Sequence, residues 1–216
     1  MVDAGAHRAH DDFMDHTTGQ KTKNIGILLF DGMEELDAVG PWEVLAAWAD
    51  QFPEDGWAVQ LISRDGEPVR CAKGMVISPM CSIDTAPDLE VLVHPGGDGT
   101  LPLMSDQAHL EWLRGQRAKV PLMTSVCTGS LVYAAAGLLE GRPATTWWGA
   151  LDTLAETDPT IELRTSDRFV DDGDVVTASG VSAGIDMALH LVVRLAGESR
   201  AKDVRRYIQY DPQPPV

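Results

Sequence analysis

Cys127 lies where two sequence patterns meet. The residues before it, VPLMTSV (120–126), form a short apolar run typical of a buried strand, and an alanine- and leucine-rich run typical of a helix follows. A cysteine at such a turn is either a small core residue or a thiol held ready for chemistry. A helix N-terminus offers free N–H groups and a partial positive charge, which favour a thiolate and let the Thr128 N–H stabilise a developing anion. We therefore predict a reactive Cys127 thiol with a lowered pKa.

Asp37 is the second residue with chemical potential. It lies in the acidic stretch EELDAVGP (34–41), where Pro41 predicts the first turn of a helix that continues to about Asp50. From the residues alone, the Asp37 carboxylate is equally a cap for that helix or an acid–base group acting beside the thiol.

Strands and helices are predicted to alternate around these residues. Apolar runs predict buried strands at 24–30, 57–63, 89–97 and 120–126, a short strand or hairpin piece at 74–82, a short strand at 142–148 and a hairpin about Asp171-Asp172-Gly173. Helices are predicted at about 106–118, 128–139 and 150–156, after Gly180, and over 201–210. This order favours a doubly wound α/β fold, a mostly parallel sheet with helices on both faces. Ligands of such folds bind beyond the carboxyl ends of the strands, so we expect the site at loops 31–40, 95–100 and 127–130.

Composition narrows the class of function. The formal net charge of −16 argues against binding to nucleic acid or to anionic membranes, which needs clustered Lys and Arg. The three cysteines show no CxxC spacing, which argues against a disulfide scaffold or a zinc ribbon. The polar N-terminus has no signal-peptide pattern, and no apolar run approaches the ~18 residues of a membrane span. We expect a cytoplasmic protein whose partner is a small molecule.

The chain divides into a polar N-terminal segment and one domain. Residues 1–22 contain His7, His10 and His16 and could form a metal-binding tract. A disordered extension, whether or not it belongs to the natural protein, is the favoured interpretation. Residues 24–216 are long enough to form a single domain with its own core.

Four segments give the chain a family resemblance. In order, they are IGILLFDGMEELDAVGPWEVL, VLVHPGG, TSVCTGSLVYAAAGLLEGRPATT and SGVSAGIDMALHL. With them the chain resembles the ThiJ/PfpI superfamily, which is related to class I glutamine amidotransferase domains, and is most similar to its isonitrile (isocyanide) hydratases. It is almost as similar to the sensor domain of regulators that carry an AraC-type DNA-binding module, for which we expect no room before Val216.

The resemblance implies a flavodoxin-like fold with the cysteine on a nucleophile elbow, and a homodimer. It makes Cys127 the nucleophile, Asp37 its acid–base partner and Thr128 a further catalytic residue, with the backbone N–H groups of Gly97 and Thr128 as anion donors. No metal or organic cofactor is implied. The protease-like branch usually has a histidine directly after the cysteine, so Thr128 counts against peptidase activity.

The activity implied is hydration of isonitriles to N-substituted formamides through a covalent thioimidate. Two alternatives stay open: a small-molecule or redox sensor with an oxidisable Cys127, and glyoxalase- or hydrolase-like chemistry on another electrophilic carbon. Relatives commonly have a histidine where this chain has Trp147, which predicts a more apolar pocket and leaves the substrate open.

Five further residues are weaker candidates. His94 ends a predicted strand and is a possible pocket residue, whereas Cys71 and Cys81 are expected to be core or incidental thiols. Asp186 and His190 have metal-ligand spacing on a helix but no third ligand, so a capping or interface pair is favoured.

Overall fold

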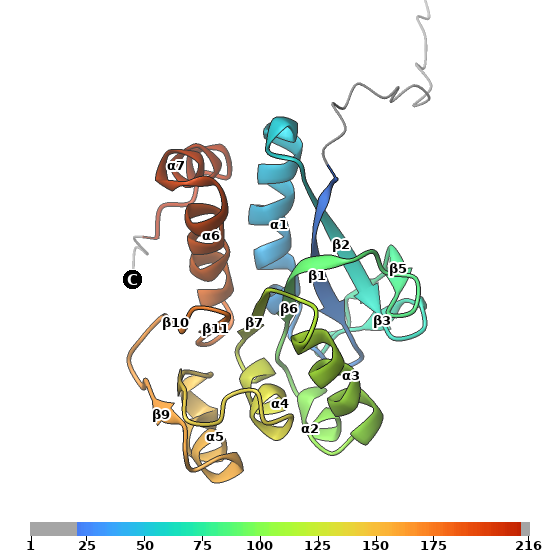
Figure 1. Ribbon diagram of the computed structural model, residues 1–216, viewed down its shortest axis with the longest axis vertical. Coiled ribbons are helices and arrows are strands. Elements are labelled where there is room, and N and C mark those ends of the chain that lie inside the picture. Colours follow the sequence, from blue (N-terminus) through green and yellow to red (C-terminus); the bar gives the residue numbers. More distant parts are fainter. Residues whose placement is uncertain (1–20, 213–216) are drawn as a thin grey trace, which may run out of the picture.

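The computed structural model describes residues 21–212, and its centre is a seven-stranded sheet (Figure 1). The strand order is β10-β11-β7-β6-β1-β2-β5, and every neighbouring pair is parallel except β10 and β11. The strands are β1 (Lys23–Leu29), β2 (Trp57–Ser63), β5 (Cys81–Ser82), β6 (Leu89–His94), β7 (Leu122–Val126), β10 (Phe169–Asp171) and β11 (Val175–Ala178). The predicted doubly wound α/β fold is confirmed.

Helices cover both faces of the sheet. One face packs against α1 (Glu35–Gln51), α6 (Ala183–Ala196) and α7 (Glu198–Tyr207), and the other against α2 (Thr100–Leu103), α3 (Gln107–Arg117), α4 (Gly129–Ala135) and α5 (Leu151–Thr157), as Figure 1 shows. Two apolar cores result, one containing Ile25, Ile27 and Leu29, the other Leu92 and Met123. Strands buried on both faces need the continuous apolar runs that the sequence has. Within the described residues, no helix is both long and apolar enough to cross a membrane.

Several short strands and single-turn helices accompany the main sheet and its helices. The 74–82 segment splits into β4 (Val76–Ile77), which pairs antiparallel with β3 (Val69–Arg70), and β5, which joins the edge of the main sheet beside β2. The predicted strand at 142–148 is reduced to β8 (Pro143–Ala144), which pairs in parallel with β9 (Glu162–Leu163). Two single-turn helices lie at Pro53–Asp55 and Trp148–Ala150.

The predicted start of α1 at Pro41 is wrong. The helix begins at Glu35, and Pro41 lies inside it. An interior proline removes one helical hydrogen bond. Here its ring packs closely on α6, where a Cβ added to Gly184 would lie 3.2 Å from Pro41 Cγ. Tight packing between α1 and α6 therefore offsets the hydrogen bond that is missing at Pro41, a residue that the sequence pattern placed at the start of the helix.

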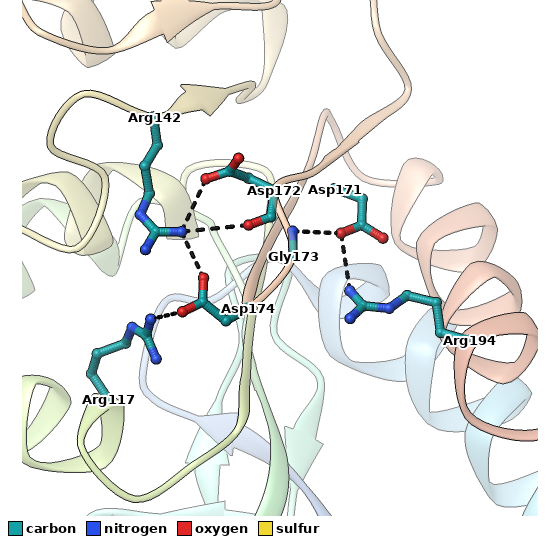
Figure 2. Close-up of polar contacts among 7 residues, drawn as sticks. All are labelled: Arg117, Arg142, Asp171, Asp172, Gly173, Asp174 and Arg194. Atoms are coloured by element: carbon teal, nitrogen blue, oxygen red, sulfur yellow. Dashed lines mark hydrogen bonds and ion pairs between the residues drawn. The ribbon is translucent and has the colours of Figure 1, made fainter.

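The turn between β10 and β11 is held by arginines from three other segments (Figure 2). Arg142 Nη1 contacts Asp172 Oδ2 at 2.9 Å and Asp174 Oδ1 at 2.6 Å, and further pairs join Arg117 to Asp174 and Arg194 to Asp171. The hairpin predicted about Gly173 is confirmed. This network fixes β11, whose carboxyl end binds the backbone of Cys127.

Candidate active site

Cys127 occupies a strained turn between β7 and α4. Its φ is 56°, a left-handed conformation that costs a residue with a side chain roughly 1–2 kcal/mol. The turn is held from both sides. The Cys127 N–H donates to the carbonyls of Ala178 (3.1 Å) and Ser179 (2.9 Å), and its carbonyl accepts from the hydroxyls of Thr146 (2.9 Å) and Ser130 (3.1 Å). These hydrogen bonds thus hold Cys127 in a backbone conformation that it would otherwise avoid.

Gly96 allows the loop after β6 to approach this turn. A Cβ at Gly96 would lie 2.4 Å from the Thr128 nitrogen and 2.9 Å from Cys127 Cβ, far inside van der Waals contact. The same residue binds the start of α1, since its carbonyl accepts from the Glu34 N–H at 2.9 Å. The three loops predicted to form the site therefore meet, and the absence of a side chain at Gly96 allows this close contact.

Asp37 is fully buried in the first turn of α1. Its Oδ2 accepts a hydrogen bond from the Gly96 N–H at 2.9 Å, whereas Oδ1 makes no hydrogen bond of normal geometry to a residue within 21–212. The helix cap is Glu34, not Asp37, so the capping interpretation of Asp37 is not supported. A buried carboxylate with one unused oxygen is suited to exchanging a proton with a neighbour.

Burial raises the pKa of Asp37 from 3.8 to about 7, a value close to physiological pH. The Gly96 N–H opposes this rise, and the charge of Glu34 adds to it. The nearby Cys127 thiol also favours the ionised carboxylate. Asp37 therefore titrates in the range where both a general acid and a general base are useful.

The predicted low pKa of Cys127 is wrong. The side chain is buried, and burial together with the charge of Asp37 raises its pKa from 9.0 to about 12. The N–H groups of Thr128 and Val181 and the Thr128 hydroxyl lower it, but do not outweigh desolvation. At neutral pH the sulfur thus keeps a proton that an ionised Asp37 is placed to remove.

Val181 is a site residue that the sequence reading missed. Its φ is 44°, which is a genuine outlier for a β-branched residue, and its N–H faces the Cys127 sulfur. The glycine- and serine-rich stretch SGVSAG marks a turn at this point, but nothing in one sequence assigns a left-handed conformation to valine. Together with the Thr128 N–H, this group forms a pair of donors around the sulfur.

The Gly97 N–H, which we predict to be an anion donor, binds a side chain of the site. It donates to Thr128 Oγ1 at 2.8 Å, and the Gly97 carbonyl accepts from Thr100 Oγ1 at 2.7 Å. Gly97 and Thr128 therefore lie together as expected, but this N–H can reach a developing anion only by giving up or sharing its bond to Thr128. The donors free of such competition are those of Thr128 and Val181.

A pocket of about 370 Å³ opens onto Cys127. Its walls are largely apolar, and its volume lies near the lower end of the roughly 300–1,000 Å³ typical of small-molecule sites. The lining residues are Glu34, Gly97, Asp98, Thr100, Leu101, Cys127, Thr128, Leu131, Trp147, Ala150, Thr153 and Val181.

The weaker candidates lie away from this pocket. His94 is fully buried: its Nδ1–H donates to the Pro95 carbonyl at 2.7 Å, and its Nε2 accepts from His109 at 3.1 Å. Burial lowers the pKa of His94 to about 3, so it stays neutral. Cys71 is a buried core thiol and Cys81 a partly buried one, and all three cysteines are unpaired.

Asp186 and His190 do not form a pair. Asp186 binds Arg168 (Nε to Oδ2, 2.8 Å) and the Tyr210 hydroxyl (3.0 Å), whereas His190 binds Asp171 (2.6 Å). Both residues therefore hold helix α6 to neighbouring elements. The three histidines of the N-terminal segment lie outside the described residues.

Comparison with known proteins adds a decisive observation: the DJ-1/PfpI family profile matches residues 23–194. The chain belongs to this family. It is 42% identical, over 88% of its length and 80% of the relative, to the isonitrile hydratase of Pseudomonas putida. It is also 30% identical to the HTH-type transcriptional regulator CdhR of Pseudomonas aeruginosa, over 85% of this chain but only 54% of the regulator.

The family fold is also seen in solved structures. A ThiJ/PfpI family protein from Pseudomonas syringae superimposes with a TM-score of 0.82 and 33% identity, covering 96% of this chain and 86% of that one. The expected ThiJ/PfpI membership is confirmed. Within the family, similarity to a curated isonitrile hydratase supports the hydratase branch.

Proposed function

We propose that this protein is a cysteine-dependent isonitrile hydratase that converts isonitriles to N-substituted formamides without a cofactor. The single observation that carries the proposal is the 42% identity to an isonitrile hydratase over 88% of the chain. The chemistry of Cys127 and Asp37 fits the reaction.

In the first step the isonitrile carbon gains a sulfur and a proton. Asp37, as carboxylate, takes the proton of the Cys127 thiol while the sulfur bonds to the terminal carbon of R–N≡C. Asp37 then delivers that proton to the same carbon. The product is the thioimidate R–N=CH–S–Cys127, and the carboxylate is restored. Near pH 7 the Cys127 thiol keeps its proton while Asp37 is about half ionised, so a large share of the molecules hold the carboxylate beside the protonated thiol that this step needs.

In the second step water replaces the sulfur. Asp37 takes a proton from water, the oxygen bonds to the thioimidate carbon, and the nitrogen receives that proton, giving R–NH–CH(OH)–S–Cys127. The C–S bond then breaks, the hydroxyl proton passes to the sulfur, and R–NH–CHO leaves. The N–H groups of Thr128 and Val181, which favour an ionised sulfur, stabilise the departing thiolate.

A second candidate is a small-molecule sensor. The similarity to the regulator CdhR favours ligand binding as an alternative to turnover. Redox sensing is less well supported, because oxidation proceeds through the thiolate and the buried Cys127 thiol has a pKa of about 12. Glyoxalase-like chemistry on aldehydes uses the same thiol and is the third alternative.

The test is formamide formation from several aryl and alkyl isonitriles by the purified protein, by Cys127→Ala and by Asp37→Asn. Turnover lost in both variants supports both roles, with Thr128→Val as a probe of the hydroxyl that neighbours the sulfur. Absence of formamide from the reduced wild-type protein with every isonitrile would contradict the proposal. Binding without turnover would then favour the sensor, and consumption of methylglyoxal the glyoxalase alternative.

Two further expectations accompany the proposal. We propose a homodimer, as the resemblance implies, and a cytoplasmic location, which suits three unpaired cysteines. Sedimentation of the purified protein and fractionation of cells test them.

A further inference from the structure

Trp147 is the wall between two pockets. On one side lies the 370 Å³ pocket that contains Cys127, and on the other a pocket of about 350 Å³. The second pocket is more polar and is lined by Thr146, Trp147, Trp148, Thr165, Ser166, Asp167, Arg168, Ser179, Gly180 and Val181. Among residues 21–212, two line both pockets, Trp147 and Val181.

The indole of Trp147 is seated on two glycines. A Cβ at Gly180 would lie 2.6 Å from Trp147 Cδ1, and a Cβ at Gly149 would lie 2.5 Å from Trp147 Cζ3. The ring also packs beside Trp148, with 5.1 Å between the ring centroids. These contacts fix a large apolar plate across the space that a long ligand would need to occupy.

Other walls of the Cys127 pocket belong to buried parts of the fold. Leu131 is buried in α4, and Ala150 is buried directly before α5, so neither can retreat without disturbing the core. Val181 is held in its left-handed conformation next to the sulfur. Trp147 is the larger of the two side chains that line both pockets, so its truncation would open the Cys127 pocket toward the second one.

We propose that Trp147 determines the substrate class: it restricts the enzyme to isonitriles with a compact, apolar R group and excludes long ones. This inference rests on the proposed isonitrile hydratase activity. Trp147 acts as a specificity residue and takes no part in proton transfer, because the indole offers no group that could exchange a proton in the reaction.

The experiment compares kcat/KM for cyclohexyl isonitrile, a compact probe, and biphenyl isonitrile, a long one. Wild type is expected to prefer the compact probe. Trp147→Ala joins the two pockets, so the compact-to-long ratio should fall by about tenfold or more, the size of effect that a pocket wall of this kind produces. Tyr207→Ala is the matched control, because this aromatic side chain is 55% exposed and lines neither pocket, and the ratio should stay within about twofold.

A binding measurement separates this inference from the proposed function. In a Cys127→Ala background, calorimetry gives Kd for N-cyclohexylformamide and N-biphenylformamide with Trp147 present or replaced by Ala. If no isonitrile is turned over, the hydratase proposal fails, while a Kd ratio that shifts with Trp147 still supports its role as a wall. An unchanged ratio in both assays, from folded Trp147→Ala protein, overturns the inference about Trp147.

Discussion

The buried Asp37 carboxyl should make the protein less stable as pH rises, and Asp37→Asn should remove that dependence. In the unfolded chain this group loses its proton near its ordinary pKa of 3.8, whereas in the folded protein it keeps the proton until about pH 7. Between these values the folded state binds more protons, so the stability that the neutral carboxyl confers is lost as pH rises through about 7.

The size of the effect follows from the shift. At about 1.4 kcal/mol per pKa unit, the full penalty for ionising Asp37 in the folded state is roughly 4 kcal/mol. Between about pH 5.5 and pH 8.5, ionisation of Asp37 should lower the free energy of unfolding by about 2 kcal/mol. In a chain of this length that corresponds to a fall in Tm of roughly 4–8 °C.

The assay is urea unfolding at both pH values for wild type and Asp37→Asn, read as the difference between the two proteins so that all other titrating groups cancel. Asparagine can still accept the Gly96 N–H but carries no charge. Glu43→Gln, which changes an exposed carboxyl on the same helix, is the control and should show no pH-dependent difference. A wild-type-minus-Asn difference that is constant across the range would refute the raised pKa of Asp37.

Three other predictions concern activity and stability. The value of kcat/KM should rise with pH and level off above about 7, because the reaction needs Asp37 ionised beside a protonated thiol, and a profile that is flat below pH 7 would contradict this. Gly96→Ala should abolish activity and destabilise the protein by about 1–3 kcal/mol, since its Cβ would lie 2.4 Å from the Thr128 nitrogen. The control is Gly115→Ala in α3, where no atom of the described residues lies within 4 Å of the added Cβ, and it should stabilise the protein by about 0.5–1 kcal/mol. Equal effects of the two substitutions in urea unfolding would count against the packing argument. Arg142→Gln should lower the free energy of unfolding by about 1 kcal/mol, because it removes two ion pairs to the β10–β11 turn. The loss should be smaller at high salt, which urea unfolding at two salt concentrations can measure.

The sheet was predictable because its central strands are buried on both faces. The predicted strand at 24–30 overlaps β1, and the strand at 120–126 contains β7, since continuous apolar runs are what the centre of such a sheet requires. The prediction that three loops meet at the carboxyl edge follows from topology alone and also held.

The predicted ends of helices were wrong where contacts between residues distant in sequence determine them. Helix α1 starts before Pro41 because α6 packs against the proline, a contact distant in sequence. Helix α4 ends at Ala135 and not at 139, because Gly137 adopts a left-handed conformation (φ 76°) and the Leu138 N–H turns back to the Tyr133 carbonyl at 2.9 Å.

The sequence predicted that Cys127, Asp37, Gly97 and Thr128 lie together, but not the electrostatics around them. A helix N-terminus suggests a low thiol pKa, but that inference ignores how deeply Cys127 is buried and how close Asp37 lies to it. The role of Val181 depends on a backbone conformation that valine rarely adopts, so no residue preference could point to it.

The most direct test of the account is intact-protein mass spectrometry of an acid-quenched reaction with cyclohexyl isonitrile. We expect an adduct heavier than the protein by the mass of one isonitrile, located on the peptide that contains Cys127 and absent from Cys127→Ala. Formamide production that persists in Cys127→Ala would contradict the central claim that this thiol forms the bond to carbon.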